Sequence, residues 1–385
     1  MSDLLIPFFR PSISDEEIDV VVDCLRSGWL TTGPNSSAFE TEFSEALDGE
    51  VISLAVNSAT AALHLAIDAL RIGPGDEVIV PTLTFTATAE VVRYQGAKPV
   101  FVDIDPDTLC LSLEAVEAAI TPSTKVIMAV HFAGRPCNLT ALRKLAGSHG
   151  LKIIDDAAHA FPSIHAGKNI GHCLADATAF SFYANKTMTT GEGGMLVTRD
   201  PALAARARTM RLHGIDRDVF NRFSDNKVSW VYDVVAPGYK YNMTDIAAAM
   251  GRVQLRKAYG FMETRKRLAA TYDAAFAKLP LILPPHAAEG DSHSWHLYVV
   301  QLTDDGPLNR DEFISYLKDN GIGLSVHYRP LHQMTYWAPF AEGCVFPAAD
   351  NYFDRCVSLP LFMDMSDDEQ NRVIQVVREA LVMPA

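Results

Sequence analysis

A chain of 385 residues exceeds the length that a single hydrophobic core usually serves, so we expect two domains that fold without disulfides or metals. Hydrophobic residues make up 48% of the chain and charged residues 21%, and no stretch reaches the roughly 18 apolar residues of a membrane helix, which excludes a membrane protein. The net charge of −14 argues against nucleic-acid binding, which normally requires a basic surface.

The start of the chain and its cysteines indicate the compartment. Residues 1–14 lack the basic stretch, apolar core and small-residue cleavage site of a secretory signal. The 6 cysteines include no C-x-x-C pair, which fits neither a zinc cluster nor a disulfide framework. We therefore expect a soluble protein of the cytoplasm.

The first predicted element is an amphipathic helix. Ser14 and Glu17 have the spacing of a capping box, and Gly28 is placed to end the helix. Strands and helices then alternate over the segments 77–80, 87–94, 100–102, 113–119, 126–130, 139–149, 152–154 and 178–182. This alternation predicts an α/β fold with a mostly parallel sheet covered on both faces, and ligands bind such sheets at the carboxyl ends of the strands.

The pattern changes near Met243, where a long run of helix-forming residues begins. It covers residues 244–279 and is interrupted by prolines from Pro280 onward. Beyond it, a smaller α+β domain is indicated by segments 296–302 and 323–328, a helix from about Asn309 and a helix after Ser366. We expect a large domain of residues 1–250 and a small C-terminal domain of residues 251–385.

The densest chemical signal is the run of residues 181–194, SFYANKTMTTGEGG. Lys186 follows a predicted strand and precedes a glycine-rich turn, which allows the backbone to approach a ligand closely. Taken alone, a lysine in a loop is usually a surface residue, so further motifs must support a functional role.

A second motif supports that role. Apolar strand residues run into Asp155 and Asp156, and His159 follows shortly after. A partly buried aspartate can keep the ring nitrogen of a pyridine cofactor protonated by charge pairing, and Asp156 is our candidate. The alternative is an aspartate that only caps the next turn.

Two turns and four histidines complete the candidates. Residues 57–63 form a hydroxyl-rich turn opening a helix, whose free amides suit a phosphate, and Phe85 follows a strand where its ring could lie against a flat cofactor. On its own, Phe85 fits equally well in a core. No metal is expected, because the histidines lack matching cysteine or carboxylate spacing; they are His293, His296, His327 and His332.

Together these motifs resemble the DegT-like family of sugar-nucleotide aminotransferases, which depend on pyridoxal 5'-phosphate (PLP). The resemblance spans nearly the whole chain, with landmarks at residues 28–34, 57–63, 155–159, 181–194 and 238–245. It implies the PLP-dependent transferase fold of type I, with a mostly parallel seven-stranded sheet, helices on both faces and a smaller α+β C-terminal domain.

The resemblance also implies roles for individual residues. Lys186 would hold PLP covalently and carry the proton, Asp156 would pair with the ring nitrogen, and His159 would pack beside the ring, with Phe85 over its other face. The phosphate would be bound by Thr60, Ala61, Ser181 and, from a partner subunit, Asn242. That shared site implies a homodimer. The sugar nucleotide would be contacted by Trp29, Thr31, Lys240, His327 and Tyr328.

The implied reaction moves an amino group from glutamate to a keto sugar linked to a nucleotide. Residues 235–245, 294–297 and 321–323 are most similar to members that aminate the UDP-linked 4-keto pentose in forming 4-amino-4-deoxy-L-arabinose, which favours C4 of a UDP-sugar. Residues 181–187 are instead similar to members acting on GDP-4-keto-6-deoxymannose, so the sugar and the nucleotide stay open. Phe85 and Pro162 depart from the residues usual in the pentose enzymes, tryptophan and glycine.

Two other classes compete with this interpretation. A regulatory relative could keep PLP without turnover, although no helix-turn-helix extension or basic patch supports a regulator. A PLP enzyme for small amino acids would need an arginine to clamp a carboxylate, for which Arg329 is available. The resemblance argues against a dehydratase, because dehydratases of the family carry histidine where this chain has Lys186.

Overall fold

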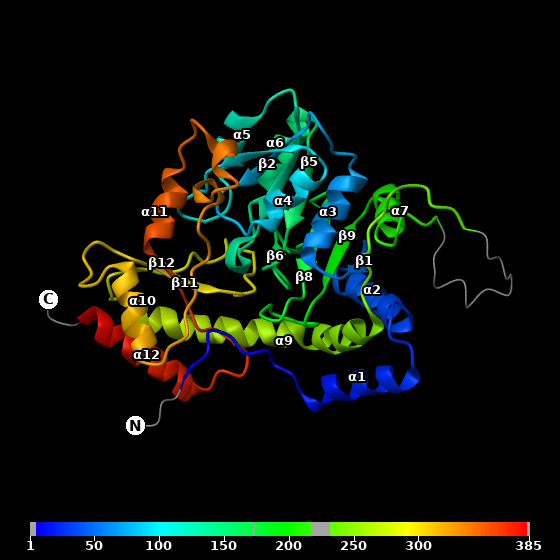
Figure 1. Ribbon diagram of the computed structural model, residues 1–385. Coiled ribbons are helices and arrows are strands. Elements are labelled where there is room, and N and C mark those ends of the chain that lie inside the picture. The colour runs from blue at the N-terminus through cyan, green and yellow to red at the C-terminus, as the bar shows by residue number, and fades with distance from the viewer. Residues whose placement is uncertain (1–4, 173, 217–231, 383–385) are drawn as a thin grey trace.

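The computed structural model describes residues 5–172, 174–216 and 232–382, and a seven-stranded sheet lies at its centre (Figure 1). In spatial order the strands are β1 (Ile52–Val56), β9 (Gly194–Thr198), β8 (Ala177–Ser181), β5 (Lys152–Asp156), β4 (Thr124–Val130), β2 (Glu77–Pro81) and β3 (Lys98–Val102). All pairs are parallel except those of β9, which runs antiparallel to both of its neighbours. The predicted mostly parallel seven-stranded sheet is therefore confirmed.

Helices cover both faces of this sheet because its buried strands are apolar on both sides. In β2, for example, Val78 and Val80 enter one hydrophobic core and Ile79 enters the other. The first core also contains residues of α3 (Ala59–Ala69), α4 (Ala87–Tyr94) and α7 (Pro201–Met210). The second contains residues of α2 (Pro34–Ala46), α5 (Leu113–Ala119), α6 (Leu139–His149) and α9 (Asp245–Phe276).

The predicted first helix is present as α1 (Asp15–Ser27). Ser14 and Glu17 form the expected capping box, and Gly28 ends the helix in the left-handed conformation with φ of 75°. Helix α1 packs along α9, which passes beneath the sheet and extends toward the C-terminal part (Figure 1). Within the described residues, no helix combines the length and apolar character needed to cross a bilayer.

The C-terminal part has its own antiparallel sheet and hydrophobic core. The sheet contains β10 (Leu281–Ile282), β11 (Tyr298–Leu302) and β12 (Cys356–Leu359). Its helices are α10 (Arg310–Asp319), α11 (Pro347–Arg355) and α12 (Asp367–Val382), so the helices predicted near Asn309 and after Ser366 are confirmed. A hairpin of β6 (Ile164–His165) and β7 (Lys168–Asn169) lies apart from both sheets.

One predicted segment differs from the structure. Residues 323–328 form no strand, and within the described chain they contribute only an isolated bridge between Ser325 and Ser358. The segment leaves the sheet at this point because the side chains of His327 and Tyr328 line a cavity instead. The domain division at residue 250 stays a prediction, and α9 is continuous across that position.

Candidate active site

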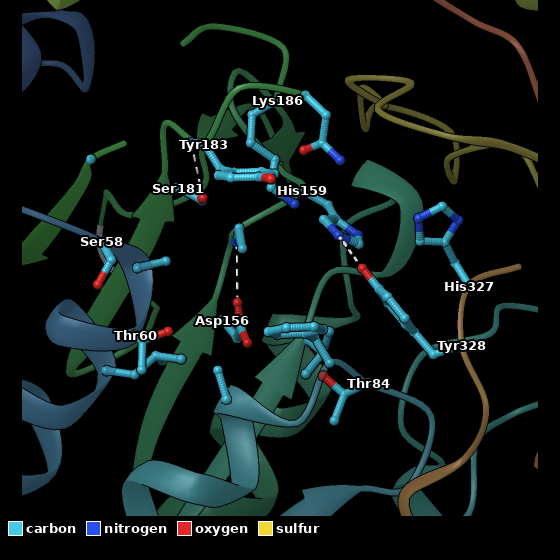
Figure 2. A pocket seen from close by; sticks show the side chains of 18 of the residues that line it. Ser58, Thr60, Thr84, Asp156, His159, Ser181, Tyr183, Lys186, His327 and Tyr328 are labelled. Carbon is cyan, nitrogen blue, oxygen red and sulfur yellow. Dashed lines mark hydrogen bonds between the residues drawn. The ribbon is translucent and has the colours of Figure 1, made fainter. Parts of the chain in front are cut away.

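A cavity of about 400 Å³ opens beside the carboxyl ends of β5 and β8 and the start of α3 (Figure 2). This is the edge of the sheet at which ligands of α/β folds bind. Eight of the predicted site residues line it, namely Thr60, Phe85, Asp156, His159, Ser181, Lys186, His327 and Tyr328. Segments distant in the sequence therefore meet in one site.

Lys186 lies in the turn after β8, where its backbone N–H donates to the carbonyl oxygen of Tyr183 at 3.0 Å. Burial lowers the pKa of Lys186 to about 8, and the negative charge of Asp156 offsets part of that effect. A larger fraction of this amine is therefore neutral near pH 7 than for a lysine in water. A neutral amine can act as a nucleophile or a base.

Asp156 ends β5 and faces the cavity with a carboxylate that is oriented by two donors. Thr88 Oγ1 donates to Oδ2 at 2.7 Å, and the backbone N–H of Ala158 donates to Oδ1 at 3.2 Å. Burial raises the pKa of Asp156, while these hydrogen bonds and the charge of Lys186 oppose the rise. A cationic ring nitrogen placed here would gain a charge partner, so the site fits a protonated pyridine.

His159 and Tyr328 form a pair whose protons can be assigned. Nδ1 of His159 accepts a hydrogen bond from the backbone N–H of Ala133 at 3.2 Å, and Nε2 lies 3.0 Å from the Tyr328 hydroxyl. Burial, together with the charge of Lys186, holds the pKa of His159 well below its usual value. The ring is therefore neutral with its proton on Nε2, which donates to Tyr328 and leaves the Tyr328 proton free for a ligand.

The start of α3 forms the end of the cavity opposite His327 and Tyr328, and Ser58 and Thr60 lie there (Figure 2). Ser58 caps the helix by accepting from the N–H of Ala61 at 3.1 Å, and the first N–H groups have no partner within the helix. Gly194 of β9 passes close by, and a Cβ at position 194 would lie 2.5 Å from the carbonyl carbon of Ser58. Glycine at this position lets strand and helix start approach each other, which creates a suitable place for a phosphate.

The other five predicted residues lie outside this cavity. Ala61 is buried in the first turn of α3, and its N–H is already bound by Ser58. Asn242 donates to Thr32 Oγ1 at 2.8 Å and accepts from Lys240. Trp29 Nε1 donates to the carbonyl of Thr32, and Thr31 is exposed beside it. We call the group of Trp29, Thr31, Lys240 and Asn242 the outer cluster.

The structure adds residues that the sequence interpretation missed. Thr88 orients Asp156, and Thr84 contacts Thr88 at 2.8 Å, a pair that the four-residue spacing after a strand could have indicated. Tyr183 lines the cavity beside Ser181, whose Oγ accepts from the Tyr183 N–H at 3.3 Å. His296 lies 3.5 Å from the amine of Lys186, although the sequence offered it only as a rejected metal ligand.

Arg329, the residue proposed for the small-amino-acid class, does not line the cavity. It is exposed, and its guanidinium donates to the carbonyl of Gln333 at 2.7 Å. A lysine and an aspartate facing one cavity, with a helix start for a phosphate, on this seven-stranded sheet, define the PLP-dependent transferases of fold type I.

Comparisons with known proteins give the family. Residues 11–378 match the DegT/DnrJ/EryC1/StrS aminotransferase family, and the chain belongs to it. The spore coat polysaccharide biosynthesis protein SpsC of Bacillus subtilis is 45% identical over 97% of this chain and 96% of its own length. The expected family and enzyme class, a PLP-dependent sugar aminotransferase, are therefore confirmed.

Solved structures agree with this assignment. Spr1654 of Streptococcus pneumoniae, assigned as a sugar aminotransferase and solved in its PMP-form, superposes with a TM-score of 0.91 at 36% identity, over 97% of this chain and 98% of its own. Its PLP-form gives a TM-score of 0.89 at 35% identity, over 98% of this chain and 100% of its own. PseC of Helicobacter pylori, an aminotransferase of pseudoaminic acid biosynthesis, gives 0.87 at 28% identity, over 98% and 99%.

Proposed function

We propose that this protein binds PLP and moves an amino group from glutamate to the C4 keto group of a nucleotide-linked sugar, with UDP as the favoured nucleotide. The observation that carries the proposal is the placement of Lys186 and Asp156 in one cavity, with the start of α3 at its far end. When bound, PLP supplies an electron sink that stabilises negative charge at the Cα of the donor and carries the amino group to the acceptor.

Lys186 has two roles in this proposal. Its Nζ holds the cofactor between reactions, and after release it moves a proton between the donor Cα and C4′ of the cofactor. The lowered pKa of Lys186, about 8, suits this second role because the base must be neutral when it takes the proton. In the second half-reaction the same amine returns a proton to the sugar carbon.

The remaining cavity residues hold and orient the cofactor. Asp156 keeps the ring nitrogen protonated, and His159 packs beside the ring while its Nε2–H fixes the hydroxyl of Tyr328. Phe85 is 58% exposed at the mouth of the cavity, where its ring is free to cover the other face. Thr60 and Ser181 bind the phosphate at the start of α3.

The outer cluster serves a second copy of the chain in this proposal. Lys240 bonds to Asn242, Trp29 and Asn242 both bond to Thr32, and the cluster lies outside the cavity of its own chain. The backbone of Asn242 nevertheless pairs with Val56, directly before the phosphate end. In a symmetric dimer, Asn242 would complete the phosphate site of the partner. Trp29, Thr31 and Lys240 would contact the sugar nucleotide there, together with His327 and Tyr328 of the first chain.

The substrate assignment is supported by sequence similarity and by relatives. SpsC is named for spore coat polysaccharide biosynthesis and PseC for the biosynthesis of pseudoaminic acid, so a role in making amino sugars for a polysaccharide is consistent with both. The cavity walls favour a sugar over a small keto acid because Arg329 is turned toward Gln333 rather than toward a substrate carboxylate.

The test is a two-step assay of the PLP-loaded protein. Glutamate should abolish the visible absorbance of the bound cofactor and release 2-oxoglutarate, whereas a regulatory relative would release none. UDP-4-keto-pentose, GDP-4-keto-6-deoxymannose and pyruvate are then compared as acceptors, and the UDP-sugar should be aminated fastest. Lys186→Ala should lose both the absorbance and turnover, and retained turnover would contradict the proposal.

A further inference from the structure

A histidine outside the predicted site contacts the amine of Lys186. His296 lies just before β11, is only 4% exposed and places Nε2 at 3.5 Å from Lys186 Nζ. Among the described residues it is the one hydrogen-bonding partner of that amine. The distance is at the long end of hydrogen bonding, and the flexible lysine stem allows it to shorten.

The other nitrogen of this ring is also informative. Nδ1 of His296 is buried without a hydrogen-bond partner, and so is Oδ1 of Asn185. Both residues line a second, smaller cavity of about 10 Å³, walled by Phe8 and Leu359 among others. That space suits about one water molecule, which would hydrogen-bond to both polar atoms. An unsatisfied pair of this kind would otherwise destabilise the fold.

The surrounding charges determine the protonation of His296. Burial and the nearby charges of Lys186 and Arg265 hold the pKa of His296 well below its usual value, so the ring is neutral. Arg265 Nη1 donates to the carbonyl oxygen of His296 at 3.3 Å, so the guanidinium lies close by. A neutral ring can accept from the protonated amine only through an unprotonated Nε2, which places the ring proton on Nδ1.

We propose that His296 is a positioning residue for Lys186: its Nε2 receives the free amine, and its Nδ1–H donates to one water shared with Asn185. This inference rests on the proposed function, because the amine is free only while it is not holding the cofactor. His296 then keeps Nζ beside the reacting atoms between its two roles. Without it, the four-carbon side chain would sample several rotamers, and proton transfer would slow.

Other ionisable groups around Lys186 also bear on the protonation of its amine. Asp156 of β5 favours the charged amine, and the carboxylate of Glu192 lines the same cavity. Burial lowers the pKa of His159 and of His327 and raises that of Tyr328, so these three groups are neutral. An acceptor on His296 stabilises the protonated amine as well. Removing that acceptor should therefore lower the pKa of Lys186 further.

The test measures Lys186 directly in the full chain freed of cofactor. Competitive labelling with acetic anhydride, followed by mass spectrometry of the peptide containing Lys186, gives the pH midpoint of its reactivity. The midpoint should lie near pH 8 in the unchanged protein and about one unit lower in His296→Leu, because a hydrogen bond to a charged group is lost. In His296→Gln the amide oxygen can accept from the amine, so the midpoint should return most of the way to that of the unchanged protein.

His293→Leu is the matched control. His293 is buried in the same segment, where it stacks on Trp295 and accepts from the Trp295 N–H rather than contacting Lys186, so its loss should leave the midpoint unchanged. An unchanged midpoint in His296→Leu, or an equal shift in His293→Leu, would overturn the inference. A crystal structure must also show the water between His296 and Asn185; a dry cavity contradicts that part.

A kinetic readout separates this inference from the proposed function. In the PLP-loaded protein, His296→Leu should slow the single-turnover reaction with glutamate by about tenfold or more while PLP affinity stays within about twofold. If the unchanged protein fails to react with glutamate, the proposed function is wrong. If it reacts and His296→Leu reacts equally fast, only the role of His296 is wrong.

Discussion

At the scale of single residues, the site depends on two ionisable groups whose pKa values are shifted in opposite directions by burial. Burial raises the pKa of Asp156 and lowers that of Lys186, so both are brought closer to neutrality, and each partly offsets the shift of the other. A bound cationic ring would favour the charged form of Asp156 and release Lys186 to act as a neutral base. The two residues are therefore complementary.

Asp156→Asn tests this complementarity. Asparagine keeps the shape of the side chain and can still accept from Thr88, but it carries no negative charge to hold the ring proton. The rate of the reaction with glutamate, followed by rapid-mixing absorbance, should fall by about 100-fold or more. Thr88→Val keeps the charge of Asp156 and removes one hydrogen-bond donor to it, so the rate should fall only about tenfold. A rate for Asp156→Asn within tenfold of the unchanged protein would contradict the assigned role.

Sequence reasoning was effective for residues whose chemistry is local. Lys186 and Asp156 stand in short motifs after strands, so the shared edge of a parallel sheet was enough to bring them together. His296 could not be assigned in this way, because its role depends on a contact across 110 positions of the chain. The side chain of Asn242 is equally non-local, and its prediction came from family resemblance alone.

At the scale of elements, α1 is attached to α9 by a buried carboxylate. Glu17 accepts from Ser14 and Gln254 and pairs with Lys257 at 2.8 Å, so one side chain caps α1 and joins it to α9. Burial alone would raise the pKa of Glu17, but the hydrogen bonds from Lys257, Ser14 and Gln254 outweigh it and lower the pKa to about 2.

This shift predicts a pH-dependent stability. A carboxyl group whose pKa is lowered by folding stabilises the folded state fully when the pH is above its unfolded pKa of 4.5. This stabilisation is lost as the pH falls toward about 2. Glu17→Gln should lower the free energy of unfolding by about 2 kcal/mol at pH 7, measured from urea midpoints, and the difference should shrink below pH 4.5. Glu16→Gln removes exposed pairs with Arg256 and Lys257, and because exposed pairs contribute little, it should change the midpoint little. A pH-independent difference for Glu17→Gln would contradict this account.

The order of strands shows where element prediction stopped. Segments from 77 to 181 were recognisable because each has its own apolar run or helical period. The strands β1 and β9 were not identified; β9 begins directly at the end of the glycine-rich turn, which obscures its start. Residues 323–328 have the composition of a strand but line the cavity, so tertiary contacts override their local preference.

At the scale of the whole molecule, the predicted site residues divide into two groups. Eight line one cavity, whereas the outer cluster lies outside it, held by bonds among Trp29, Thr32, Lys240 and Asn242. In a single chain the outer cluster has no catalytic role. In a symmetric pair of chains both groups would have a role, because each chain would supply the cavity of one site and the outer cluster of the other. Dilution to monomers should then abolish cofactor binding.

Subunit complementation tests this arrangement more sharply than dilution. Lys186→Ala and Asn242→Ala should each inactivate their own dimers, the first by removing the base and the second by weakening the phosphate site of the partner. Subunits mixed in equal amounts and allowed to exchange should regain about one quarter of the unchanged activity, because half of the dimers are hybrids and each hybrid has one intact site. If Asn242 served its own chain instead, both sites of every hybrid would be defective and the mixture would stay inactive. Mixing Lys186→Ala with Asp156→Asn is the control; both changes affect the same cavity group, so no activity should return.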